Sequence, residues 1–140
     1  MSQENVEIVR AAIDAYNHKD WRSVLKDTAP DFELDMSGAL GPVHGLYGRG
    51  QLLGVLTDFA ESFESVRIEP HEFIEAGDDV VVPWTAHMVG RDGIDVHARI
   101  TWTWTIRNGA IERVCMYQGE QEALRDAGLR GSAAGYRSSC

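Results

Sequence analysis

Residues 95–118, DVHARITWTWTIRNGAIERVCMYQ, decide the fold of this chain. Apolar and polar residues alternate along the first half of this stretch, and Trp102 and Trp104 fall on its apolar face. Strict alternation of β-branched and aromatic residues with polar ones is typical of a half-buried strand. The pair Asn108-Gly109 then favours a tight hairpin turn, because both residues tolerate the positive φ that such turns require. A sheet face that carries two tryptophans must be covered by other elements, or must itself cover a ligand.

The composition indicates one globular domain with an acidic surface. The chain has 140 residues, of which 44% are hydrophobic and 25% charged, and its formal net charge is -9. These values are those of a soluble domain that is long enough to bury a core. An acidic surface repels phosphate backbones and anionic lipids, so nucleic-acid and membrane partners are disfavoured. The N-terminal residues lack the apolar run of a signal peptide, and we therefore expect a cytoplasmic protein.

The two cysteines give no sign of a disulfide framework or of a metal site. Cys115 lies in a predicted strand and Cys140 is the last residue. Their spacing does not fit a metal site, and reduced thiols in a cytoplasmic protein are the simplest interpretation. The sequence also lacks a phosphate-binding glycine loop and a nucleophile elbow. We therefore expect no metal and no cofactor.

The order of the predicted elements indicates an α+β domain. Hydrophobic spacing predicts helices over residues 3–17 and 50–63, and Asp20 can cap a short helix that begins at Trp21. Strands are expected over residues 32–36, 66–75 and 80–89, followed by the hairpin, with a last helical turn over 120–127. Helices segregated from an antiparallel sheet make an α+β domain. A strongly bent antiparallel sheet wrapped over the N-terminal helices would form a cone with one open end.

Several blocks of the chain resemble a known family. These are MSQENVEIVR, AYNHKD, APDFELDMSG, AGDDVVV, WTIRNGAIERVCMY and EALRDAGL, which together span about residues 2–129. They resemble the SnoaL-like proteins of the nuclear transport factor 2-like superfamily. The resemblance implies a cone fold with a pocket between the helices and the concave sheet face, and commonly a homodimer. It implies little about function, because isomerases, cyclases, dehydratases and non-catalytic binding proteins share this fold. We expect a SnoaL-like domain over residues 1–129 and a mobile tail over 130–140.

Asp35 is the first candidate for chemistry in this pocket. Its position resembles that of the proton-shuttling base of ketosteroid isomerases, which needs partial desolvation to work near neutral pH. The alternative is a solvated or backbone-capping carboxylate at a strand end. The two proton donors of the isomerases correspond here to Ala12 and Trp102, so both donors are absent and a steroid isomerase mechanism is disfavoured.

His87 is the second candidate, and its direction depends on a hairpin register. If the turn is centred on Arg91 and Asp92, His87 lies opposite Val96 and points into the cone, and Trp84 points outward. A shift of one residue reverses both directions. A histidine facing a carboxylate is a plausible acid–base pair. The alternative is a structural or solvent-facing histidine. His44 could line the pocket mouth, and His71 and His97 are expected to face outward.

The remaining pocket residues follow from the alternation of the strands and from the first helix. We expect the pocket to be lined by Ala12, Tyr16, Ile100, Trp102, Trp104, Val114, Met116 and Gln118. The convex face would then carry Arg99, Thr101, Thr103, Arg113, Cys115 and Tyr117. Such a mixed surface suits a homodimer contact, and a solvated sheet face is the alternative.

Two functions stay open on these grounds. The first is cofactor-free acid–base chemistry, as in an isomerase, cyclase or dehydratase, on a hydrophobic ring-containing carbonyl compound. Asp35 would be its base, His87 its acid or base partner, and Tyr16 and Gln118 would orient the substrate. The second is a non-catalytic small-molecule binder or dimeric scaffold of the same fold.

Overall fold

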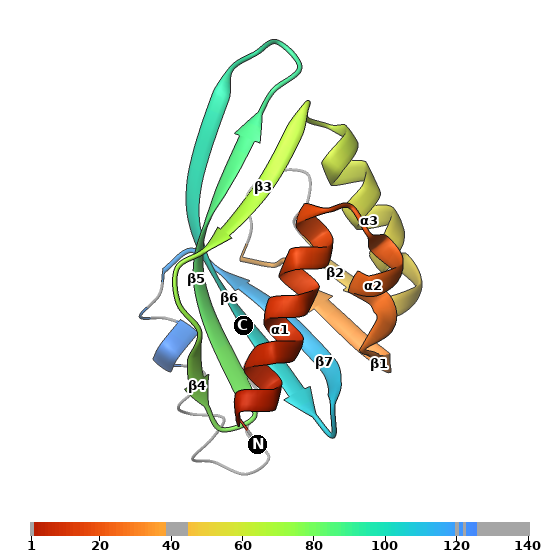
Figure 1. The fold of residues 1–140 in the computed structure, drawn as a ribbon, viewed down its shortest axis with the longest axis vertical. Coiled ribbons are helices and arrows are strands. Elements are labelled where there is room, and N and C mark those ends of the chain that lie inside the picture. Colours follow the sequence, from red (N-terminus) through yellow and green to blue (C-terminus); the bar gives the residue numbers. More distant parts are fainter. Residues whose placement is uncertain (1, 39–44, 120, 122, 126–140) are drawn as a thin grey trace.

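The protein folds as three helices on one side of a bent sheet (Figure 1). The computed structural model describes residues 2–38, 45–119, 121 and 123–125. The helices are α1 (Ser2–Asn17), α2 (Trp21–Lys26) and α3 (Arg49–Glu61). The strands are β1 (Thr28–Asp35), β2 (Leu46–Gly48), β3 (Ser65–Pro70), β4 (Ile74–Ala76), β5 (Asp79–Val89), β6 (Asp95–Arg107) and β7 (Ala110–Tyr117). This is the α+β cone that the sequence predicts.

The sheet is mixed, whereas the sequence pattern suggested a purely antiparallel one. The strand order is β2-β1-β7-β6-β5-β3, and β4 pairs with β5 beside β3. All neighbouring strands are antiparallel except β1 and β7, which run parallel. Parallel neighbours need a long connection between them, and here everything from β2 to β6 forms that connection. No local pattern in the sequence indicates which strand β1 will meet.

Most element boundaries lie within a few residues of the predicted ones. Asn108 and Gly109 have φ values of 53° and 77° and form the predicted turn between β6 and β7. The strand expected over 66–75 is instead two strands, β3 and β4, because the chain leaves the ladder after Pro70. Of the expected C-terminal helical turn the structure describes residues 121 and 123–125, which are helical. The expected tail over 130–140 lies outside the described residues.

The register between β5 and β6 differs by one residue from the predicted one. His87 pairs with His97, and Val96 pairs with Met88. The loop between the strands has five residues, 90–94, because the Gly90 N–H bonds the Ile94 carbonyl at 2.8 Å and Gly93 adopts a φ of 86°. The odd number of loop residues moves the pairing by one position and turns every β5 side chain to the other face. The expectation that His87 points inward and Trp84 outward is therefore wrong.

The core lies between α1 and the concave face of the sheet. Val6, Val9 and Ile13 of α1 are buried there together with residues of β1, β5, β6 and β7. The side chain of Asn17, at the end of α1, fixes the helix to β3. Its Nδ2 donates to the Ile68 carbonyl and its Oδ1 accepts from the Ile68 N–H, both at 2.8 Å. These two bonds hold the C-terminal end of α1 at the edge of the sheet.

Two further expectations are tested by the structure. No helix among the described residues is both long and apolar enough to cross a membrane. Cys115 is buried and disulfide-bonded, so the expectation of a reduced thiol is wrong for this residue.

Replacing Asn17 tests the attachment of α1 to the sheet. We expect Asn17→Ala to lower the free energy of unfolding by about 1–3 kcal/mol, because the Ile68 N–H and carbonyl lose their partners in a partly buried place. Asn17→Asp keeps the acceptor and should lose less. Urea unfolding followed by circular dichroism measures both changes, and equal stability of all three proteins would contradict this role.

Candidate functional site

A cavity of about 810 Å³ lies between the helices and the concave face of the sheet. Its volume falls within the range of roughly 300–1,000 Å³ that is typical of small-molecule sites. Its wall is mainly apolar and comes from all three helices and from six strands, β1, β2, β3, β5, β6 and β7. The exposed residues Asp58 and Ser62 also line it and mark where it meets solvent.

All eight expected pocket residues line this cavity. They are Ala12, Tyr16, Ile100, Trp102, Trp104, Val114, Met116 and Gln118. Sequence reasoning missed the contribution of β5, which supplies Trp84, Ala86 and Met88 because of the register described above. It also missed the α3 residues Val55, Leu56 and Phe59. The apolar spacing along residues 52–63 was the available signal for this second group, since a helix with such a stripe must bury it.

Three tryptophans form one continuous part of the wall. The rings of Trp84 and Trp102 have centroids 4.1 Å apart and are tilted by 37°, and those of Trp102 and Trp104 are 5.5 Å apart and nearly perpendicular. Offset and edge-to-face pairs of this kind are favourable arrangements of aromatic rings. The three Nε1 atoms are buried and have no hydrogen-bond partner in the described part of the chain. The wall is therefore aromatic and carries donors that have no acceptor.

Tyr16 and Gln118 are polar groups in the cavity wall. Burial raises the pKa of the Tyr16 phenol to about 12, because the charged phenolate is poorly solvated there. Tyr16 is thus a neutral hydroxyl at physiological pH, and its ring packs edge-on against Trp21 at 5.5 Å. The Gln118 Nε2 donates to the Gly38 carbonyl at 2.7 Å, so its amide is held at the end of β7.

Asp35 does not line the cavity, and the expectation that it faces the pocket is wrong. Leu34 pairs with Val114 and faces the cavity, so the next residue, Asp35, lies on the outer face beside Cys115. The Asp35 side chain is buried there. Its Oδ1 accepts from the N–H and hydroxyl of Ser37 at 2.9 and 2.5 Å, and its Oδ2 accepts from Arg113 at 3.0 Å. This carboxylate is therefore part of a buried ion pair, away from any ligand in the cavity.

His87 also lies on the outer face. Its Nε2 lies 2.6 Å from Glu69 Oε1, and its Nδ1 lies 2.8 Å from His97 Nδ1. His71 bonds Thr85 at 2.6 Å on the same face, so His71 and His97 face outward as expected. His44 lies outside the described residues. Among the described lining residues, Asp58 alone carries a carboxylate and none is a histidine.

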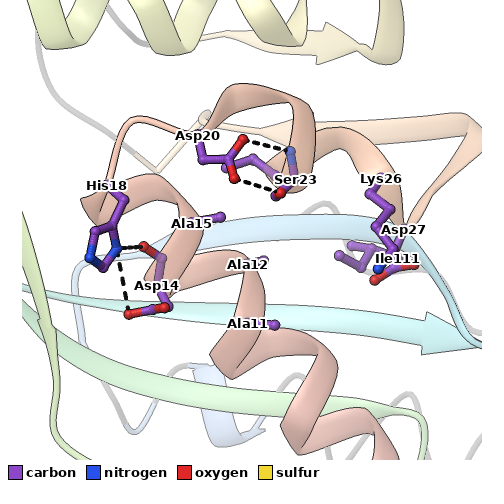
Figure 2. Close-up of a pocket in the computed structure, with 11 residues that line it drawn as sticks. Ala11, Ala12, Asp14, Ala15, His18, Asp20, Ser23, Lys26, Asp27 and Ile111 are labelled. Carbon is purple, nitrogen blue, oxygen red and sulfur yellow. Dashed lines mark hydrogen bonds and ion pairs between the residues drawn. The ribbon is translucent and has the colours of Figure 1, made fainter.

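A second, smaller hollow of about 470 Å³ lies between α1 and α2 (Figure 2). Alanines of α1 form part of its wall, and its polar residues already serve the helix ends. Asp20 caps α2 by accepting from the backbone and hydroxyl of Ser23, which lowers the pKa of Asp20. The His18 ring contacts the Asp14 carbonyl at 2.8 Å. These groups are engaged in local helix capping, and the larger cavity is the stronger candidate site.

Much of the outer, convex face of the sheet is covered by other parts of the same chain. Thr101, Thr103, Cys115 and Tyr117 are nearly inaccessible, and the last two pack with Val81 and Ala123. The expectation of an exposed patch at these four residues is wrong. The part of this face nearer the β5–β6 loop, around Glu69, His87 and Arg99, is more accessible.

Comparisons with known proteins agree with this architecture. TerC, whose crystal structure contains polyporic acid, superposes with a TM-score of 0.75 at 24% identity over 89% of this chain and 97% of that one. A nuclear transport factor 2-like protein of unknown function from Burkholderia pseudomallei gives 0.73 at 24% identity, over 89% and 97%. A candidate polyketide cyclase from Xanthomonas campestris gives 0.69 at 22% identity, over 90% and 98%. Structural similarity at this level of sequence identity shows a shared fold and not a shared function.

No curated protein is similar enough in sequence to count as a relative. The family model of the SnoaL-like domain, in contrast, matches residues 9–114, which run from the second half of α1 into β7. Because this match covers most of the cone, the chain belongs to the SnoaL-like domain family.

Proposed function

We propose that this SnoaL-like domain binds a hydrophobic, ring-containing carbonyl compound in the large cavity. The observation that carries the proposal is an apolar wall of about ligand size with a neutral hydroxyl, that of Tyr16, set into it. Apolar area supplies most of the affinity in such sites, and a few polar groups fix the orientation of the ligand. The co-crystal of TerC with polyporic acid supports the idea that this kind of cone accepts a small organic molecule.

The tryptophan wall favours an aromatic ligand with oxygen acceptors. Trp84 and Trp102 offer ring faces for offset stacking, which adds roughly 0.5–1.5 kcal/mol beyond area burial. A buried donor without an acceptor carries a desolvation penalty of about 1–3 kcal/mol. A carbonyl oxygen that reached one of the indole N–H groups after a small ring movement would relieve such a penalty. A plain hydrocarbon of the same shape would not.

The structure favours ligand binding over a catalytic function in which Asp35 and His87 act as acid and base. General bases must come within hydrogen-bond reach of the proton that they abstract, directly or through one water. The sheet separates both side chains from the cavity. The Tyr16 hydroxyl could still polarise a bound carbonyl, and Asp58 at the cavity mouth is an exposed carboxylate. Homodimer formation through the outer sheet face stays a prediction.

Filling the cavity tests the proposed site directly. Ala98 lines the cavity on β6, and Ala98→Phe would place a ring in the space that a ligand needs. We expect 9-fluorenone to quench the fluorescence of the wild-type tryptophans and to bind the variant at least about tenfold more weakly, a loss of 1.4 kcal/mol or more. Val89→Phe on the outer face is the matched control and should bind normally. Equal binding by Ala98→Phe would contradict the proposal.

Tyr16→Phe tests the hydroxyl. We expect it to weaken 9-fluorenone binding by about 0.5–1.5 kcal/mol, the usual net value of one hydrogen bond, and to leave fluorene binding unchanged.

The wild-type Tyr16 hydroxyl should also make the stability of the protein more sensitive to alkaline pH than that of Tyr16→Phe. An unfolded tyrosine ionises near pH 10 and folded Tyr16 near 12, so its contribution to stability is complete below about pH 10 and lost as pH rises toward 12. Unfolding curves from neutral to alkaline pH should show a smaller alkaline loss in the variant.

Asp35→Asn separates a structural role from a catalytic one. Removing one partner of a buried ion pair leaves Arg113 poorly compensated, so we expect a loss of about 3–5 kcal/mol of unfolding free energy. Glu33→Gln, which removes the more exposed partner of Arg113, should cost no more than about 1 kcal/mol. The folded Asp35→Asn protein should keep its affinity for 9-fluorenone. Lost binding with unchanged stability would place Asp35 at the ligand instead.

A further inference from the structure

Three side chains on the outer face form a continuous hydrogen-bonded row across β3, β5 and β6. Glu69 Oε1 lies 2.6 Å from His87 Nε2, and His87 Nδ1 lies 2.8 Å from His97 Nδ1. His87 and His97 are directly opposite each other in the strand register, and their rings are nearly perpendicular with centroids 4.7 Å apart. Paired strands hold both backbones, so the approach of the two rings does not depend on a loop.

The glutamate fixes which nitrogen of His87 carries hydrogen. Glu69 is exposed, and an exposed glutamate is ionised near neutral pH, so its carboxylate only accepts hydrogen bonds. His87 therefore donates from Nε2, and in the neutral ring its Nδ1 carries a lone pair. That lone pair faces Nδ1 of His97. When the His97 ring carries its hydrogen on Nε2, two imidazole lone pairs meet at one place.

We propose that His87 and His97 bind a divalent late first-row transition metal ion, Cu²⁺ above all, through their two Nδ1 atoms. A carboxylate that accepts from the far nitrogen of a metal-binding histidine is the usual way to hold such a ligand in place. Glu69 stands in that position as a positioning residue. On binding, the hydrogen between the two Nδ1 atoms would move to Nε2 of His97, which leaves a lone pair on each Nδ1 for the ion.

The spacing of the nitrogens selects the kind of metal. Two ligands about 2.0 Å from a metal and at right angles to each other lie about 2.8 Å apart, whereas tetrahedral Zn²⁺ needs about 3.3 Å. The observed separation is 2.8 Å. Square-planar coordination by nitrogen and oxygen is typical of Cu²⁺, which also binds imidazole more tightly than the other divalent ions of its row. Mg²⁺ and Ca²⁺ prefer oxygen ligands and do not suit the pair.

The site would be open, with water in the remaining positions. In the described part of the chain no group of three or more histidine, cysteine or acidic side chains is arranged to hold a metal, so the protein supplies two ligands. The His87 side chain is 25% exposed and His97 is exposed, which leaves room for water on the ion. Arg67 pairs opposite His87 on β3, and its charge opposes cation binding. The net charge of -9 acts in the other direction.

Titration of the full chain with CuCl₂ tests the site. We expect the wild-type protein to bind one equivalent more tightly than the rest, with an electron paramagnetic resonance spectrum that shows coupling to two imidazole nitrogens. The double variant His87→Gln/His97→Gln should lose this equivalent. Glu69→Gln should weaken it by about 10–100-fold, the usual effect of removing a group that orients a ligand. His18→Gln, at an exposed histidine on α1, is the control and should bind as the wild type does.

Two results would overturn the site. One is equal Cu²⁺ affinity of the wild type and the double variant, and the other is a wild-type spectrum without coupling to two imidazole nitrogens. Near-ultraviolet circular dichroism checks that each variant is folded. If the double variant does not fold, Glu69→Gln decides the matter, because an unchanged affinity in that folded variant would also overturn the proposal.

Discussion

The register of the β5–β6 hairpin is the constraint on which the rest of the structure depends. Eleven residue pairs, from Asp79–Thr105 to Val89–Asp95, share this register. It places Trp84 and Ala86 against the cavity and turns Thr85 and His87 outward. A slip of one residue would exchange the two sets. Burying a large apolar side chain stabilises by about 1.5–3 kcal/mol, so exposing Trp84 and its neighbours on that face would be strongly unfavourable.

The sheet also separates charge from the cavity. Asp35, Arg113, Glu69 and His87 all lie on the outer face, where each carboxylate has a cationic or hydrogen-bonding partner. A carboxylate on the concave face would have met an apolar wall, and an unpaired buried charge is worth several kcal/mol of instability. The fold thus keeps an apolar, aromatic interior on one side of the sheet and a network of paired charges on the other. Within this arrangement, the proposed ligand would gain affinity from apolar area and selectivity from hydroxyl and amide groups.

The sequence predicted the parts of the fold that local patterns control. Alternation identified β6, Asn108 and Gly109 identified its turn, and helical spacing identified α1 and α3. All eight expected pocket residues line the cavity, because they lie on α1, on β6, and on β7 or directly after it, where the pattern defines the faces. The direction of β5 could not be obtained in this way. Its residues 80–84 are apolar on both faces, since Val81 is buried outside and Val80 and Val82 inside, so alternation gives no register.

The prediction that Asp35 faces the pocket was wrong for a different reason. Its place in the chain matched a family position, but its direction depends on β1 pairing in parallel with β7, a contact between residues far apart in the sequence. Only the assembled sheet shows that Leu34 and Val114 share the inner face and leave Asp35 beside Cys115. The disulfide of Cys115 was likewise beyond what cysteine counting could predict.

The parallel contact between β1 and β7 also sets the order in which the protein can be completed during synthesis. The partners of residues 28–35 are residues 111–115, so β1 leaves the ribosome long before the strand that it must join. Pairing between such distant segments carries a large entropic cost and is intrinsically slow. Until β7 is made, one edge of β1 and one edge of β6 have no partner strand, and chains tend to associate wrongly at unpaired edges of this kind. A truncated or stalled chain would therefore expose the interior of the cone, and the last strand made is the one that closes it.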